Sequence, residues 1–238
     1  MDLKEECILG HDISKHWYYR SKLAALLHYV RHLAPRKILD VGAGSGFFSK
    51  GLLHQTEAQE ALCVDTGYSS EKEEFVNGKS VQFRTGCGQT EVDLVLMMDV
   101  LEHVDDDVGL LDEYVKKVPA GTHFLITVPA FSFLWSGHDV FLEHKRRYSL
   151  PEVEDVVNRA GLSVESSSYY YGLIFPLAAT TRLISRLFSQ QNNYSRSQLK
   201  RHHTVINEIL AYICSVDLLM LRRNRLAGLT VFCLAQKP

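Results

Sequence analysis

Three glycines follow the first strongly apolar segment of the chain and restrict its fold more than any other feature. Residues 37–41 have the apolar character of a buried β-strand, and Asp40-Val41-Gly42-Ala43-Gly44-Ser45-Gly46 leads from it into a helical pattern. Glycine lets the backbone adopt positive φ and approach a ligand closely. The free N–H groups of the following helix suit a carboxylate or phosphate. The pattern predicts a strand, a tight turn and a helix, with or without a ligand on the turn.

A carboxylate at the end of the next predicted strand favours the interpretation in which a ligand binds at the turn. Asp65 ends the run Ala61-Leu62-Cys63-Val64, roughly twenty residues after the glycines. At this edge of a parallel sheet it can accept hydrogen bonds from both ribose hydroxyls of an adenosine. The glycine spacing GxGxG differs from the GxGxxG of dinucleotide-binding folds. Together, the turn and Asp65 indicate a nucleoside-containing ligand.

The remaining chain alternates between short apolar runs and helical patterns, which predicts βαβ units and a mostly parallel sheet with helices on both faces. Its 238 residues suit a single domain, 1–238. Seven strands are expected, at residues 37–41, 61–65, 81–84, 92–98, 123–128, 162–170 and 229–235. Helices are expected at residues 13–33, 46–54, 69–75, 104–117, 150–159, 173–188 and 205–221.

The composition fits a soluble globular protein, with 46% hydrophobic and 23% charged residues and a net charge of -2. The five cysteines are widely spaced and form no CxxC pair, which favours reduced thiols over a disulfide framework or a structural zinc site. The first ten residues lack the basic and apolar regions of a signal peptide. No uninterrupted apolar run reaches about 18 residues. We therefore expect a cytoplasmic location and no membrane span.

A third motif gives the chain a family resemblance. It is the run Val92-Asp93-Leu94-Val95-Leu96-Met97-Met98-Asp99-Val100-Leu101-Glu102-His103-Val104. With the glycine turn and Asp65, it resembles class I S-adenosylmethionine (SAM) dependent methyltransferases of the small-molecule type, such as the ubiquinone-biosynthesis O-methyltransferases. The resemblance covers about residues 17–170 and the last strand, and implies a Rossmann-like fold with SAM as cofactor.

The resemblance also assigns roles to individual residues. It implies that Asp65 holds the ribose and that the backbone near Met98 lies beside the sulfonium. The methionine part of SAM would be surrounded by Asp40, Gly42, Gly44 and Gly46. Relatives often hold the adenine amine with the Asp of a Gly-Asp pair. Here Gly86-Cys87-Gly88 stands at that place, so backbone contacts near Cys87 are expected instead.

The aromatic helix start Trp17-Tyr18-Tyr19-Arg20 has two interpretations. In similar enzymes the N-terminal helix folds over the cofactor, which would place Tyr19 or Arg20 near the SAM carboxylate. Alternatively, Trp17 only packs on the sheet. Both interpretations stay open.

A long aromatic loop after the predicted strand 123–128 is the expected wall for the methyl acceptor, because α/β folds bind substrates at this edge. Its candidate substrate contacts are Trp135, Arg146, Arg147 and Tyr148. A hydroxyl acceptor must lose a proton, and the candidate bases are His138, His103 and His144, each also compatible with a structural role. A metal site built from His138, Asp139 and His144 is considered but not expected, because the resembling members mostly use none.

Residues 172–226 form a predicted basic helical insertion before the last strand. Between Arg182 and Arg225, eight Lys and Arg face two acidic residues, a local net charge of +6. Arg182 and Arg186 lie one turn apart beside an apolar stripe. Such helices can form a lid over the acceptor, rest on an anionic membrane surface, or simply pack together.

These observations predict a methyltransferase that transfers the SAM methyl group to a small or lipid-like acceptor, at oxygen in preference to nitrogen or carbon. No nucleic acid partner is expected, and the oligomeric state is not predicted. Two alternatives stay open. The chain could methylate RNA or protein, which only the basic segment supports, or bind SAM without catalysis as a partner subunit or sensor.

Overall fold

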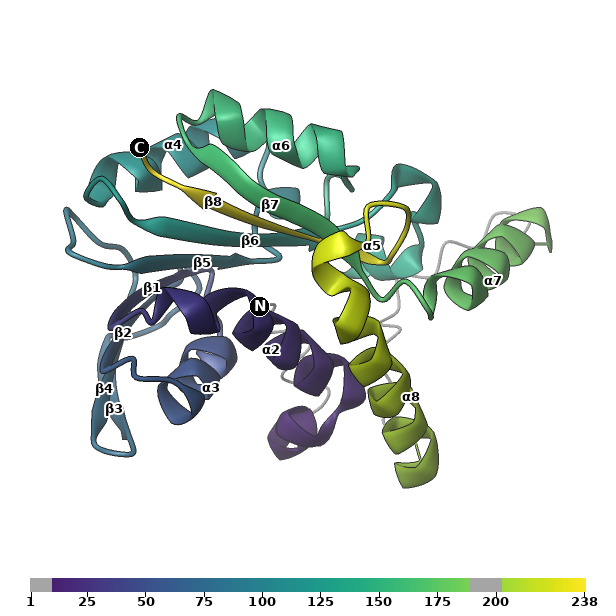
Figure 1. Ribbon diagram of the computed structural model, residues 1–238, viewed down its shortest axis with the longest axis horizontal. Helices are drawn as coiled ribbons and strands as arrows, with labels where there is room; N and C mark the ends of the chain where they lie inside the picture. Colours follow the sequence, from purple (N-terminus) through teal and green to yellow (C-terminus); the bar gives the residue numbers. More distant parts are fainter. Residues whose placement is uncertain (1–9, 189–202) are drawn as a thin grey trace.

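One mixed sheet of eight strands lies between two layers of helices in the computed structural model, which describes residues 10–188 and 203–238 (Figure 1). The strand order is β3-β4-β2-β1-β5-β6-β8-β7, and β3 and β8 run antiparallel to their neighbours. The strands are β1 (Lys37–Val41), β2 (Glu60–Val64), β3 (Lys72–Val76), β4 (Lys79–Arg84), β5 (Leu94–Met98), β6 (His123–Pro129), β7 (Ser163–Tyr170) and β8 (Thr230–Gln236). The predicted Rossmann-like α/β class is confirmed.

The described residues form seven α-helices and five 3-10 helices. The α-helices are α2 (Trp17–Val30), α3 (Phe47–Gln55), α4 (Asp107–Lys117), α5 (Gly137–Phe141), α6 (Leu150–Arg159), α7 (Phe175–Phe188) and α8 (Thr204–Asp217). The 3-10 helices are η1 (Gly10–Lys15), η2 (Arg31–Leu33), η3 (Leu101–His103), η4 (Ser132–Leu134) and η5 (Leu218–Arg223).

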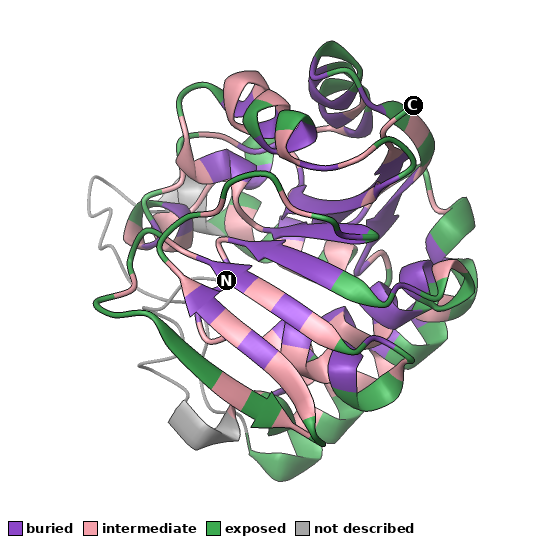
Figure 2. Ribbon diagram, turned by 90° about the vertical axis from the view of Figure 1, so that its left-hand side faces the viewer, coloured by how far each residue is buried: buried purple, intermediate pink, exposed green. Residues whose placement is uncertain are grey.

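The alternating residues of the central strands supply two separate cores. Ile38 of β1 packs in a core with α2, α3 and Cys214 of α8, while its neighbour Leu39 packs in a second core with α4 and α6. This is the pattern expected of strands that are covered on both faces. Figure 2 shows the central strands mostly buried. Both layers therefore hold the ends of β1, β2 and β5 in fixed positions.

The strand count and one predicted helix are wrong. Residues 69–75 were expected to be helical, but Lys72–Val76 forms the edge strand β3, which pairs antiparallel with β4. The two strands are joined by Asn77 and Gly78, with φ of 53° and 78°. Two positive φ values are what a two-residue hairpin turn requires, and Asn-Gly is its strongest sequence signal. The sheet therefore has eight strands instead of seven.

Several helix limits also differ. The expected helix 13–33 is divided into η1, α2 and η2, and the expected helix 205–221 into α8 and η5. The helices α5 and η4 inside the acceptor loop were not predicted. Within the expected insertion 172–226, residues 189–202 lie outside the described residues, as do the predicted charges of Arg196, Lys200 and Arg201 and the side chain of Arg186.

Candidate functional site

The glycine turn at the end of β1 depends on its glycines. Gly42, Gly44 and Gly46 have φ of 66°, 54° and 71°, a region that other residues rarely adopt. A Cβ on Gly42 would also lie 2.7 Å from Cγ2 of Val100. The backbone N–H of Gly42 donates to the carbonyl oxygen of Val64 at 2.7 Å, which ties the turn to the end of β2.

Asp65 lies beside this turn, as its position after β2 predicts. The Asp65 carboxylate accepts hydrogen bonds from the backbone N–H groups of Gly44 at 3.0 Å and Gly67 at 2.8 Å. The hydroxyl of Tyr68 donates to the carbonyl oxygen of Gly44 at 2.5 Å. The side chain of Asp65 is half-buried, so it remains accessible next to a preorganised loop. This arrangement can hold two vicinal hydroxyls.

Asp40 lies beneath the glycine turn, inside the protein. Its carboxyl group is buried and accepts a hydrogen bond from the hydroxyl of Ser49 in α3 at 2.6 Å. Burial raises the pKa of Asp40 to about 6, although the Ser49 hydrogen bond acts in the opposite direction. The residue thus connects β1 to the first turns of α3 beneath the glycines.

A partly buried ion pair lies at the end of β5, next to Met98. Lys22 of α2 is completely buried, and its ammonium group bonds to the carboxylate of Asp99. The Asp99 carboxylate also accepts a hydrogen bond from the hydroxyl of Thr127 at 3.0 Å. Burial alone would raise the pKa of Asp99, but Lys22 outweighs it and leaves the pKa below its usual range. Sequence reasoning gave Lys22 no role, because a helical lysine is usually solvated.

A cavity of about 370 Å³ extends from this ion pair towards the acceptor loop and α7. Of the predicted site residues, it brings together Tyr19, His103, His138, His144 and Arg147. Its other walls come from the N-terminal helix, the end of β5, the acceptor loop, α7 and β8. They are Trp17, Tyr18, Phe48, Asp99, Glu102, Pro129, Leu142, Ile174, Ala178, Thr181, Arg182, Leu229 and Thr230.

Asp139 organises the acceptor side of this cavity. Its buried carboxylate accepts hydrogen bonds from Nδ1 of His144 at 3.0 Å and from Nε of Arg147 at 2.7 Å. Although burial opposes ionisation, His144 and Arg147 hold the pKa of Asp139 below its usual range. Burial lowers the pKa of His138 to about 4, so its imidazole is neutral at pH 7.

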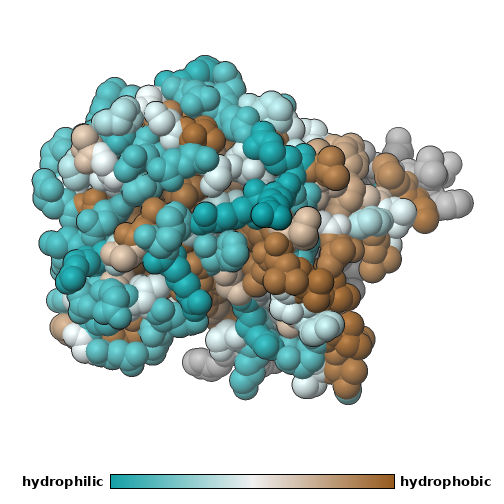
Figure 3. Space-filling model, in the orientation of Figure 1, coloured by the Kyte–Doolittle hydropathy of each residue, from teal (hydrophilic) through white to brown (hydrophobic). Residues whose placement is uncertain are grey.

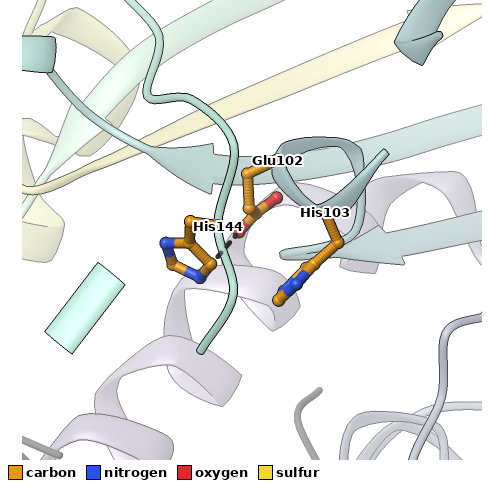
Figure 4. Close-up of side chains that lie close together, drawn as sticks. All are labelled: Glu102, His103 and His144. Carbon is orange, nitrogen blue, oxygen red and sulfur yellow. Dashed lines mark ion pairs between the residues drawn. The ribbon is translucent and has the colours of Figure 1, made fainter. Parts of the chain in front are cut away.

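Glu102 is the second residue that sequence reasoning left without a role. Its side chain is completely buried, and neither carboxylate oxygen has a hydrogen-bond partner among the described residues. Figure 4 shows it facing His144, with His103 beside them. The distance between Oε1 of Glu102 and Nε2 of His144 is 4.0 Å. Burial and the nearby charge of Asp99 raise the pKa of Glu102 well above its usual value.

Eleven predicted site residues lie outside the cavity lining: Asp40, Gly42, Gly44, Gly46, Asp65 and Met98 near the glycine turn and the end of β5, and five others. Arg20 forms an exposed ion pair with Glu208 of α8 at 2.6 Å. Arg146 pairs with Asp107, and the buried hydroxyl of Tyr148 donates to the same carboxylate at 2.8 Å. The half-buried residues Cys87 and Trp135 are also outside it. A direct substrate contact by Arg146, Tyr148 or Trp135 therefore finds no support in this geometry, whereas a cofactor contact near Cys87 stays a prediction.

Residues 15–167 match the sequence model of a family described as a methyltransferase domain. No curated protein matches the chain in sequence. Among solved structures, the chain is similar to a SAM-dependent methyltransferase from Archaeoglobus fulgidus, with a TM-score of 0.53, 16% identity and coverage of 99% of this chain and 98% of the other.

Two further structures have similar folds. A methyltransferase from Bacillus halodurans gives a TM-score of 0.54 at 13% identity, covering 92% of this chain and 99% of the other. The complex of the Haloferax volcanii Trm112 methyltransferase activator with a methyltransferase gives 0.53 at 16% identity, covering 92% and 94%. At these identities the structures support the fold, while the family match covers most of the chain.

Proposed function

Because the chain belongs to the methyltransferase-domain family and is an enzyme that uses SAM, we propose that it methylates a hydroxyl oxygen of an apolar, lipid-like acceptor. A bond forms between the acceptor oxygen and the methyl carbon as the bond between that carbon and the SAM sulfur breaks. The hydroxyl proton passes to a base, and S-adenosylhomocysteine leaves. The enzyme contributes mainly orientation and proton removal.

The observation that carries the proposal is the composition of the cavity beyond Asp99. Its wall at α7 and β8 includes the apolar side chains of Ile174, Ala178 and Leu229 beside the polar Thr181, Arg182 and Thr230. His103 and His144 lie beside Glu102, close to the end of β5. A ligand that combines an apolar body with one polar head fits such a pocket. A hydroxyl head would lie beside the histidines, with the apolar part along α7.

His138 is our choice among the three histidines for the proton acceptor. Its lowered pKa, due to burial, keeps the imidazole neutral across the physiological range. A neutral imidazole can accept a hydrogen bond from the acceptor hydroxyl. In His144, Nδ1 donates to Asp139 and Nε2 lies on the side of the Glu102 carboxylate. General base catalysis of this kind contributes typically 10²–10⁴-fold.

An apolar surface close to the cavity supports a lipid-like acceptor and contact with a membrane surface. Figure 3 shows hydrophobic residues gathered over the region where Figure 1 places α8. One face of α8 and η5 exposes apolar side chains at helical spacing: Val205, Ile206, Ile209, Tyr212, Val216, Leu219 and Met220. Leu177, Leu183 and Ile184 of α7 and Leu173 just before it are also exposed. Such a surface can bury its apolar side chains at the boundary of a bilayer.

The helical segment Thr204–Arg223 is long and apolar enough to cross a membrane, judged by length and composition only. Its opposite face packs on the protein, where Cys214, Asp217 and Leu221 are buried. We therefore propose that the helix lies on the surface of an anionic membrane, facing the cytoplasm. Arg223 at its end is exposed. Arg182 has a different position from the one expected, because its guanidinium group donates to the carbonyl oxygen of Leu134 at 2.9 Å and lines the cavity.

The acceptor proposal is tested by supplying methyl-labelled SAM with phenols that carry alkyl tails of increasing length. The expected product is the methyl ether, with kcat/KM rising as the tail lengthens, and His138→Ala should lower kcat at least 10-fold. Total RNA and denatured protein are the comparison substrates. Methylation of either, without ether formation, would overturn the acceptor proposal. SAM binding without any transfer would favour a non-catalytic partner or sensor.

The membrane proposal is tested by sedimentation with vesicles of phosphatidylglycerol and phosphatidylcholine. We expect Ile209→Ser with Leu219→Ser to reduce the bound fraction at least 5-fold. Phe75→Ser is the matched control, because Phe75 is 69% exposed on β3, at the sheet edge opposite β7. Equal binding by both variants and the native protein would contradict the membrane contact.

A further inference from the structure

We propose that Tyr18 is a further catalytic residue, whose hydroxyl group donates a hydrogen bond to the acceptor oxygen and stabilises the negative charge that forms there. Lys22 acts behind it as a positioning residue. The reaction itself rests on the proposed function, whereas the two residues and their surroundings are features of the structure. Tyr18 belongs to the aromatic start of α2 and lines the acceptor cavity together with Asp99 and His138.

Tyr18 and Lys22 lie one turn apart on the same face of α2. The ammonium group of Lys22 donates to the hydroxyl oxygen of Tyr18 at 3.3 Å and also bonds to the carboxylate of Asp99. A hydroxyl group that accepts a hydrogen bond from a cation is polarised and becomes a stronger donor. The Tyr18 hydroxyl group lies 3.5 Å from Oδ2 of Asp99, which is long for a hydrogen bond between two oxygen atoms. An acceptor oxygen in the cavity can therefore receive a shorter hydrogen bond from this hydroxyl group.

The Tyr18 side chain is held firmly, as a group that stabilises a transition state must be. Its ring stacks on the ring of Tyr171, with centroids 5.6 Å apart and planes at 16°. It meets the rings of Trp17 and Tyr19 edge to face, at 5.9 and 5.3 Å. The backbone carbonyl oxygen of Tyr18 accepts a hydrogen bond from the hydroxyl group of Tyr171 at 3.0 Å. The backbone N–H of Trp17 donates to Oδ1 of Asn207 in α8 at 2.8 Å, so the start of α2 needs little reorganisation when charge develops beside it.

Tyr18 also lies where the cofactor region and the acceptor cavity meet. Its neighbour Asp99 follows β5 directly. The next residue, Val100, packs against the glycine turn, because a Cβ on Gly42 would lie 2.7 Å from its Cγ2. Asp99 has a backbone φ of 56°, a conformation that costs energy in most residues and is concentrated at functional sites. A methyl group that leaves a cofactor on the turn therefore meets the acceptor oxygen close to the hydroxyl group of Tyr18.

The charges around Tyr18 favour a hydrogen-bond donor over a proton acceptor. Although burial opposes ionisation, Lys22 holds the pKa of Asp99 below its usual range, so Asp99 is a carboxylate at pH 7. A second negative charge on Tyr18, next to that carboxylate, is disfavoured. Tyr18 therefore keeps its proton, and the neutral imidazole of His138 accepts the proton of the acceptor hydroxyl group. Because the charge of Lys22 offsets that of Asp99, the carboxylate does not repel the acceptor oxygen as an unpaired charge would.

In the proposed step, the O–H bond of the acceptor breaks and its proton passes to His138, while Tyr18 donates to the oxygen that becomes negatively charged. A bond forms between this oxygen and the methyl carbon, and the electron pair of the broken carbon–sulfur bond stays on the sulfur of S-adenosylhomocysteine. Tyr18 thus lowers the free energy needed to ionise the hydroxyl group. Its effect should be smaller for acceptors that ionise readily by themselves.

The test uses an alkyl-4-nitrophenol, whose ionised form absorbs visible light, bound to the protein together with S-adenosylhomocysteine. Absorbance measured against pH gives the ratio of bound phenolate to bound phenol without any methyl transfer. At a given pH, we expect this ratio to be lower by roughly 10-fold or more in Tyr18→Phe than in the native protein. Lys22→Met should also lower the ratio, in protein that folds. Tyr114→Phe is the matched control and should leave the ratio unchanged, because it removes one hydroxyl group from α4 on the other face of the sheet (Figure 1).

Kinetics provide a second readout that a merely structural role would not move. With an alkyl phenol that lacks the nitro group, Tyr18→Phe should lower kcat by roughly 10-fold or more, with a smaller change in KM. With the alkyl-4-nitrophenol, which is already largely ionised at pH 8, kcat of the two proteins should differ by no more than about 3-fold. An equal loss of kcat with both phenols would indicate a structural role and overturn the catalytic one.

The remaining outcomes separate this proposal from the proposed function. An equal ratio of phenolate to phenol in Tyr18→Phe and the native protein overturns the role of Tyr18, and ether formation by the native protein then leaves the proposed function intact. If the ratio falls in Tyr18→Phe but no phenol is converted to its ether, the proposed function fails and the stabilisation of a bound phenolate by Tyr18 stands. Failure of the native protein to bind the nitrophenol overturns both.

Discussion

The cofactor region and the acceptor region are built from different kinds of interaction. In the cofactor region, backbone groups of the glycine turn bond to Val64 and Asp65, about twenty residues along the chain. In the acceptor region, buried and half-buried charged side chains bond to one another, as Arg147 does to Asp139 and Lys22 to Asp99. The first region is a preformed backbone turn, whereas the second depends on pairs of opposite charges. Removing one member of such a pair leaves the other charge buried without a partner.

The largest effect is expected from breaking the buried pair of the acceptor region. Arg147→Met leaves the carboxylate of Asp139 buried without its cation, which should lower the free energy of unfolding by roughly 4 kcal/mol. The double variant with Asp139→Leu should recover much of this loss. Urea unfolding measures the stability, and calorimetry should find S-adenosylhomocysteine affinity within 2-fold for folded protein. A comparable loss of cofactor affinity would show that the two regions are not separable.

A smaller effect on stability is expected from replacing Asp40, which lies beneath the glycine turn. Its pKa is raised by burial from 3.8 to about 6, so the folded state binds a proton more tightly than the unfolded state. Between about pH 4 and pH 6 this group makes the cofactor-free protein less stable as pH rises, by up to about 3 kcal/mol. Asp40→Asn should remove that slope and unfold at higher urea at pH 7.5, but not at pH 4. Identical pH profiles of the two proteins would contradict the buried environment of Asp40.

The smallest effect is expected at the edge hairpin, far from both regions. Gly78→Ala places a side chain at φ of 78° but meets no atom within 4 Å. The cost is therefore backbone strain alone, about 1 kcal/mol. Urea unfolding should detect this change, with cofactor affinity and methyl transfer unaltered. A much larger loss would mean that β3 contributes to more than the sheet edge.

The same contrast explains what could be predicted from the sequence. The glycine turn, Asp65 and the strands around them are encoded by local patterns, and the structure places them as expected. The missed hairpin also had a local signal, since Asn77-Gly78 lies between β3 and β4; the charged run before it was mistaken for a helix.

The acceptor region could be predicted only in part. The three histidines do meet at one cavity, as the positions of the acceptor loop and of the segment after β5 suggest. By contrast, Lys22 pairs with a residue 77 positions away, and no periodicity reveals such a partner. Glu102 lay within a recognised motif, but its burial without a hydrogen bond is visible only after the chain is folded. The sequence pattern could not predict which charged residues, far apart in the chain, pair in the folded protein.

The most direct test of the account is the affinity of S-adenosylhomocysteine for the native protein and for Asp65→Ala, measured by calorimetry. Asp65 should provide two charge-assisted hydrogen bonds to the ribose, so we expect roughly 100-fold weaker binding in Asp65→Ala. Glu73→Ala removes an exposed carboxylate of β3 and should bind as the native protein does. Unchanged affinity in Asp65→Ala, in a folded protein, would contradict the claim that the turn and this carboxylate hold the cofactor.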